Sequence, residues 1–173
     1  KMGQIVEKKM FMRSIYFQDV SYSYHGTNSN VLNKVNLEIP FPSTIGIVGD
    51  SGSGKSTLVD ILMGLLPPSS GKVLIGSRVI NCNNIVSWRK GISHVSQKSY
   101  MINDSIINNL KLEGDEVDIE YIWKCLRIAE IDKFVESLPL GIDTIVGDNG
   151  SLLSGGQRQR LLIAKSLIRD SVL

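Results

Sequence analysis

The chain has 173 residues, of which 42% are hydrophobic and 21% are charged, and 19 basic against 17 acidic side chains leave a formal net charge of +2. This length suits one domain with its own core, the apolar content excludes intrinsic disorder, and so small a charge excludes an obvious nucleic-acid footprint. No apolar run approaches the roughly 18 residues of a membrane span, the first residues carry no secretory signal, and two cysteines form no disulfide framework.

The patterns along the chain predict strands first and helices later. Residues 1–13 are basic and weakly patterned, and we expect a linker there. Apolar alternation or short apolar runs predict strands at 15–24, 35–39, 44–48, 71–80 (as a hairpin) and 92–96. Helical patterns are found at about 56–66, 104–110, 116–130, 131–138 and 154–169. Antiparallel strands followed by strands mixed with helices indicate an α/β chain with a β-rich flank.

A phosphate-binding loop stands between the predicted strand at 44–48 and the helix that follows. The stretch GDSGSGKST satisfies G-x-x-x-x-G-K-[ST] in the required strand–loop–helix context. Its glycines permit positive φ, so that successive N–H groups converge, and the helix start adds unpaired donors and partial positive charge. Lys55 supplies a charge for the β- and γ-phosphates of a nucleotide, and the Ser56 hydroxyl can ligate Mg²⁺. The predicted nucleotide contacts are Gly49, Asp50, Ser51, Gly52, Ser53, Gly54, Lys55, Ser56 and Thr57.

A second glycine-containing motif, LSGGQ, ends at Gln157, about 100 residues after the phosphate loop. Ser154 is a natural N-cap, and Gly155 and Gly156 allow close approach of another group to the backbone of the helix start. Alone, the motif would read as an ordinary capped helix. Beside a phosphate loop it predicts a second anion site, made by Ser154, Gly155, Gly156 and Gln157.

The two motifs together resemble those of the nucleotide-binding domain of an ATP-binding cassette (ABC) transporter, and the resemblance covers residues 15–173. It implies a P-loop NTPase core, an N-terminal antiparallel β subdomain and a helical subdomain carrying LSGGQ, with 14–173 forming the domain. Gln97, after a predicted strand, stands where the family's Q-loop glutamine contacts Mg²⁺ or the attacking water. Tyr24 resembles the aromatic residue that stacks on adenine, and we expect Tyr22 to face the opposite side of its strand.

Two segments resemble exporters in particular. KSYMINDSIINNL follows Gln97 and is similar to the exporter pattern F-x-x-[ST]-I-x-x-N, and GIDTIVGDNG at 141–150 resembles the exporter X-loop, which touches the membrane-domain coupling helices. Ile145 and Asp148 depart from the glutamates usual there, and Pro42-Ser43-Thr44 replaces the usual Gly-Glu. The resemblance therefore implies the ATP-binding domain of an exporter, at the cytoplasmic face of a membrane.

The resemblance also implies partners and a reaction. Two such domains meet head to tail, a transmembrane domain completes the transporter, and catalytic roles fall to Lys55 and Gln97. The family's general base lies beyond the signature helix, outside these 173 residues, so we expect them to lack hydrolysis by themselves. We also expect apolar residues of the last helix, such as Leu161, Leu162 and Ile168, to be exposed. A soluble ABC-class ATPase without a membrane domain is the alternative. A P-loop kinase or GTPase is disfavoured because LSGGQ has no role there.

Overall fold

The computed structural model describes residues 12–26, 29–95, 100–111, 117–169, 171 and 173. These residues form two compact units, one reaching to Ile92 and including Leu173, the other running from Ser93 to Ser171. Each unit is described by itself. Over the described residues, no helix combines the length and the apolar character that crossing a bilayer requires.

The first unit is built on a four-stranded antiparallel sheet with the strand order β2-β1-β3-β4. The strands are β1 (Ile15–Tyr22), β2 (Leu32–Ile39), β3 (Ser70–Ile75) and β4 (Arg78–Val79). In the register of the three longer strands, Phe17 of β1 lies opposite Leu37 on one side and Val73 on the other. The predicted antiparallel strands and the hairpin are therefore confirmed, since alternating apolar residues give this sheet one face to bury.

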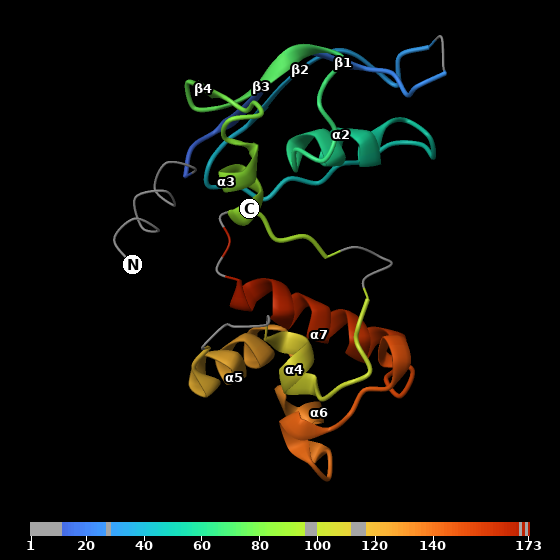
Figure 1. The fold of residues 1–173 in the computed structure, drawn as a ribbon, viewed down its shortest axis with the longest axis vertical. Helices are drawn as coiled ribbons and strands as arrows, with labels where there is room; N and C mark the ends of the chain where they lie inside the picture. Colours follow the sequence, from blue (N-terminus) through green and yellow to red (C-terminus); the bar gives the residue numbers. More distant parts are fainter. Residues whose placement is uncertain (1–11, 27–28, 96–99, 112–116, 170, 172) are drawn as a thin grey trace. The chain divides into compact units, whose positions relative to one another are not determined.

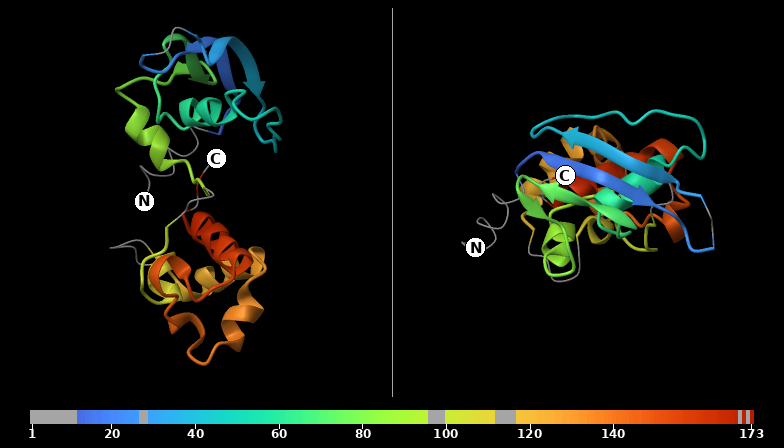
Figure 2. Two further views of the ribbon diagram at one scale, coloured as in Figure 1. Left: turned by 90° about the vertical axis from the view of Figure 1, so that its right-hand side faces the viewer. Right: turned by 90° about the horizontal axis from the view of Figure 1, so that it is seen from above.

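Two helices, α2 (Lys55–Leu62) and α3 (Ile85–Lys90), lie on the same side of the sheet (Figures 1 and 2). Phe17 and Val20 of β1, Ile61 of α2 and Trp88 of α3 meet in one core cluster, each at most 2% exposed. The indole Nε1 of Trp88 donates a 2.7 Å hydrogen bond to the carbonyl of Leu62. This contact ties α3 to the end of α2.

The strand predicted at 44–48 is wrong. These residues have no regular secondary structure, and Val48 is 92% exposed. The prediction at 92–96 fails likewise over 92–95, while Ser96 lies outside the described residues. A strand exists only when neighbours satisfy its N–H and C=O groups, and no strand of the described chain pairs with either segment.

The regular secondary structure described in the second unit is helical, apart from an isolated bridge between Ser105 and Ile145. Its elements are α4 (Ile106–Leu110), α5 (Ile119–Ile128), α6 (Asp132–Ser137), the 3₁₀ turns η1 (Gly141–Asp143) and η2 (Asp148–Gly150), and α7 (Gly155–Ile168). α7 packs on α4 and α5 (Figure 1). The core comprises Ile106, Leu126, Val135, Val146, Leu161 and Ala164 among others.

The predicted helices of this unit are confirmed within a few residues. The expectation that apolar residues of the last helix are exposed is wrong. Leu161 is 1% exposed and belongs to the core, and Leu162 and Ile168 are partly buried against that core. The other helices of the same unit cover Leu161, so α7 needs no neighbouring sheet to bury this side chain.

Candidate functional site

The loop before α2 has the backbone that the phosphate-loop motif requires. Gly49, Gly52 and Gly54 have φ values of 154°, 81° and 90°, and Gly54 forms the N-cap of α2. A Cβ on Gly54 would lie 3.1 Å from the Val31 carbonyl oxygen and 3.0 Å from Leu32 Cδ2, at the start of β2. Residues 49–53 are exposed. The loop is therefore open to an incoming group on one side and held close to β2 on the other.

The Lys55 ammonium closes over this loop. Its Nζ donates hydrogen bonds of 2.7 Å to the Gly49 carbonyl and 2.6 Å to the Asp50 carbonyl, and it lies 3.5 Å from Ser53 Oγ. The charge thus stands at the mouth of the turn and at the positive end of α2. The first N–H groups of a helix have no acceptor within the helix. An anion entering the loop would meet both these donors and the ammonium.

The hydroxyls at the start of α2 have different surroundings. Ser56 is exposed, whereas Thr57 is 4% exposed and its Oγ1 lies 2.9 Å from the Tyr24 hydroxyl. No group of three or more His, Cys, Asp or Glu side chains in the described chain could hold a metal ion. A Mg²⁺ ion, which usually keeps waters and phosphate oxygens as ligands, needs only a hydroxyl such as that of Ser56 from this loop. Gln97, the other predicted Mg²⁺ ligand, lies outside the described residues.

Tyr24 lies next to Thr57 at the end of the phosphate-loop motif, and its ring contacts that of Tyr22. β1 ends at Tyr22, and the rings of Tyr22 and Tyr24 meet edge to face with centroids 5.1 Å apart. The expectation that Tyr22 faces away from Tyr24 is therefore wrong, because residues two apart along an extended segment point to the same side. Tyr24 is 43% exposed, which leaves ring surface accessible.

The LSGGQ motif forms the capped start of α7. Ser154 Oγ accepts from the Gln157 N–H at 3.3 Å, and Gln157 Oε1 accepts from the Ser154 N–H at 2.8 Å, a complete capping box. A Cβ added to Gly155 or to Gly156 would meet no heavy atom within 4 Å. The fold of this chain therefore gives both glycines open space. The motif and the phosphate loop belong to different units, and the described geometry is that of each by itself.

Asn109 holds the turn before α4, a role that we did not predict from the sequence. It is 1% exposed, and its Oδ1 accepts from the Ile102 N–H at 2.9 Å. Its Nδ2 lies 3.0 Å from the carbonyls of Ile102 and Ser105 and 3.3 Å from that of Asp104. Asn109 is the final Asn of the F-x-x-[ST]-I-x-x-N pattern after Gln97, so the pattern itself contained the signal. Its amide fixes the turn that leads into α4.

The chain is similar to known proteins over most of its length. The family model described as ABC transporter matches residues 32–173. The multidrug resistance-like ATP-binding protein MdlB of Buchnera aphidicola subsp. Schizaphis graminum is 37% identical over 164 residues, which are 95% of this chain and 28% of that protein. The ATP-dependent lipid A-core flippase of Escherichia coli K12 is 35% identical over 158 residues, which are 91% of this chain and 27% of that protein.

A solved structure described as a bacterial Atm1-family ABC exporter with ATP bound superposes with a TM-score of 0.85 at 32% identity, covering 92% of this chain and 28% of that chain. The chain thus spans a little over a quarter of the length of these relatives. The family model, which runs from Leu32 to Leu173, includes both the phosphate loop before α2 and the capped LSGGQ turn before α7. The superposition covers 92% of the chain. The chain therefore belongs to the ABC transporter family.

Proposed function

We propose that residues 14–173 form an ATP-binding domain, preceded by a linker at 1–13, of an exporter that couples ATP binding and hydrolysis to transport across a membrane. In this proposal the P-loop part and the helical part carrying LSGGQ are the two halves of the domain. The domain works at the cytoplasmic face with a transmembrane domain as partner. The names of the relatives, a multidrug resistance-like ATP-binding protein and ATP-dependent lipid flippases, support an exporter.

The observation that carries ATP binding is the position of Lys55. Its Nζ is within 2.7 Å of two carbonyls of an exposed, glycine-rich turn at a helix start. A β- or γ-phosphate would replace two neutral carbonyl acceptors of the ammonium with an anionic one, so that donor and acceptor would both be charged. The N–H groups of the turn and of the first turn of α2 would bind the remaining phosphate oxygens.

Mg²⁺ fits the same loop. Ser56 is exposed beside Lys55 and would ligate the ion, with Gln97 as the second protein ligand. When bound, the ion would supply positive charge that offsets the negative charge of the phosphates. Tyr24 would stack on adenine, because its accessible ring lies next to Thr57 at the phosphate end of α2.

The open start of α7 supports the second half of the site. Gly155 and Gly156 face open space, so nothing in their own unit accounts for the absence of side chains. We assign these glycines, with Ser154 and Gln157, to a nucleotide held by the Lys55 of a second copy in a head-to-tail dimer. The capping box holds the N–H groups of this turn in place before the phosphate arrives.

Calorimetry with ATP and Mg²⁺ tests the proposal. Lys55→Ala should weaken ATP binding about 30-fold or more, because losing a charge-assisted contact costs about 2 kcal/mol. Lys90→Ala is the matched control, since Lys90 is exposed on α3 in the same unit and outside the phosphate-loop motif. Equal affinity of the Lys55→Ala variant and the unaltered chain would refute nucleotide binding by this loop.

A further inference from the structure

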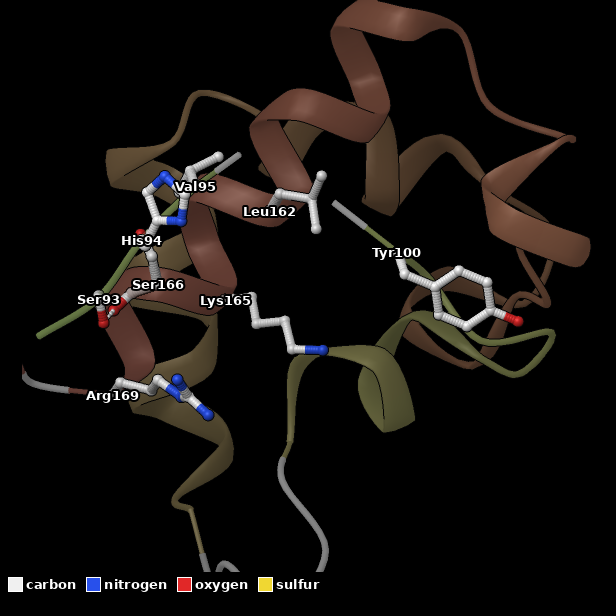
Figure 3. Close-up of a pocket in the computed structure, with 8 residues that line it drawn as sticks. All are labelled: Ser93, His94, Val95, Tyr100, Leu162, Lys165, Ser166 and Arg169. Carbon is white, nitrogen blue, oxygen red and sulfur yellow. Dashed lines mark hydrogen bonds between the residues drawn. The ribbon is translucent and has the colours of Figure 1, made fainter. Parts of the chain in front are cut away.

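A cavity of about 260 Å³ in the second unit is not part of the proposed ATP site. Its walls come from the extended residues after Ile92 and from the C-terminal half of α7 (Figure 3). Ser93 Oγ donates a 3.0 Å hydrogen bond to the Ser166 carbonyl, which fastens one wall to the other. Pockets that enclose drug-sized ligands measure roughly 300–1,000 Å³, so this cavity suits a smaller group.

The lining of this cavity is positively charged. Lys165 of α7 and Arg169, the residue after its end, are four residues apart and extend toward the same side (Figure 3). His94 and Tyr100 are the other titratable residues of the described lining. Among the described residues, no Asp or Glu lines the cavity, and none forms an ion pair with Lys165 or Arg169. Two neighbouring cations thus share the cavity without a described counter-charge.

The pKa of Lys165 is lowered, as expected for an ammonium that has no neighbouring anion in the part of the chain that the structure describes. Loss of hydration on burial, and next the repulsion of the Arg169 guanidinium, lower the pKa of Lys165 below its ordinary value. A bound anion would reverse both effects, because it would replace the lost water and screen the repulsion.

We propose that the cavity between Ser93 and the Lys165–Arg169 face of α7 binds a phosphate dianion, either free or as the end of a small phosphomonoester. Two cations favour a dianion over a single carboxylate, and a guanidinium fork beside an ammonium matches three tetrahedral oxygens. The His94 ring and the Tyr100 hydroxyl, both on the cavity wall, can donate further hydrogen bonds. The inference does not depend on ATP binding by the loop at 49–57.

The test separates this cavity from the phosphate loop by using the full chain with Lys55→Ala as the parent. Its ¹H–¹⁵N NMR spectrum is recorded during titration with inorganic phosphate, and separately with glycerol 3-phosphate, at constant ionic strength set by sodium chloride. We expect saturable shifts at Ser166 and Arg169 and a raised pKa of the Lys165 ammonium. A response to both ligands identifies the phosphate group itself as the ligand, and a response to one of them identifies its source.

Arg169→Gln and Lys165→Gln in this parent should each weaken the phosphate response about tenfold or more. Arg127→Gln, which removes the same charge from α5, should leave it unchanged. Retained spectral dispersion shows that each variant is folded, and the two separate variants provide independent readings. Shifts that chloride alone reproduces, or that persist in both cavity variants, would overturn the proposal.

Discussion

The hydroxyls of Tyr24 and Thr57 lie 2.9 Å apart and join the segment just after β1 to the first turn of α2. Thr57 is 4% exposed, so its oxygen depends on a protein partner, whereas Tyr24 is 43% exposed. The contact holds the aromatic ring proposed for adenine at the phosphate end of the helix. One hydrogen bond therefore serves both stability and the geometry of the proposed nucleotide site.

Tyr24→Phe should lower the free energy of unfolding by about 1 kcal/mol, because it removes the hydroxyl partner of Thr57 and keeps the ring. The same variant should bind ATP more tightly than Tyr24→Ala, which also loses stacking worth roughly 1–3 kcal/mol. Urea unfolding and calorimetry measure the two effects. Tyr22→Phe is the control, and a larger loss of ATP affinity in Tyr22→Ala would show that the other ring stacks.

Gly54→Ala should destabilise the chain more than Gly26→Ala. Both glycines have positive φ, 90° and 83°, so both variants pay about 1–2 kcal/mol for a left-handed alanine. A Cβ at Gly54 also meets Val31 and Leu32 within 3.2 Å, whereas one at Gly26 meets nothing within 4 Å. Overpacking of this kind adds about 1–3 kcal/mol, which urea midpoints can resolve. Equal losses of unfolding free energy in the two variants would mean that the start of β2 moves away from the new Cβ without an energetic cost.

Asn109→Ala should cost about 2–4 kcal/mol of unfolding free energy. The substitution leaves the Ile102 N–H and several carbonyls before α4 without the amide that pairs with them, and each unsatisfied buried group costs about 1–3 kcal/mol. Asn108→Ala removes an amide from the exposed side of the same helix, and we expect a loss below about 1 kcal/mol. Similar values for the two variants would contradict a structural role for Asn109.

Asp104 should titrate below its ordinary pKa of 3.8, because the Asn108 amide and the Ser105 N–H stabilise its carboxylate. A carboxyl with a lowered pKa contributes stability above the unfolded pKa and loses it as the pH falls through the folded value. Stability should therefore decline as the pH falls below 3.8. Asn108→Ala should move the pKa of Asp104 back toward 3.8 in an NMR titration, and an unchanged titration would exclude the Asn108 amide as the main cause.

The two cysteines should react at very different rates with an alkylating reagent at pH 8. Cys82 is exposed, whereas Cys125 is 2% exposed and burial raises the pKa of its thiol, so that little thiolate forms. Mass spectrometry should show one label before unfolding and two in urea. Rapid double labelling without denaturant would show that α5 opens readily.

The sequence by itself determined the elements whose reasons are local. The glycines before Lys55 and the Ser154–Gln157 capping box depend on backbone conformations and on hydrogen bonds that span at most a few residues. The alternating strands around Phe17 and the helices of the second unit were predictable for the same reason, because each pattern matches the period of one element.

Only the tertiary structure decided which distant groups meet. The run at 44–48 has the composition of a buried strand, yet no described strand pairs with it, because strand formation requires partners that periodicity cannot supply. Tyr24 contacts Thr57, 33 residues away in the sequence, and Ser93 contacts Ser166, 73 residues away. Neither contact can be predicted from the local hydrophobic pattern. The four-residue spacing of Lys165 and Arg169 predicts that they lie on one side of their helix. The cavity beside them, and the burial that lowers the pKa of Lys165, could not be predicted, because residues after Ile92 form the other wall.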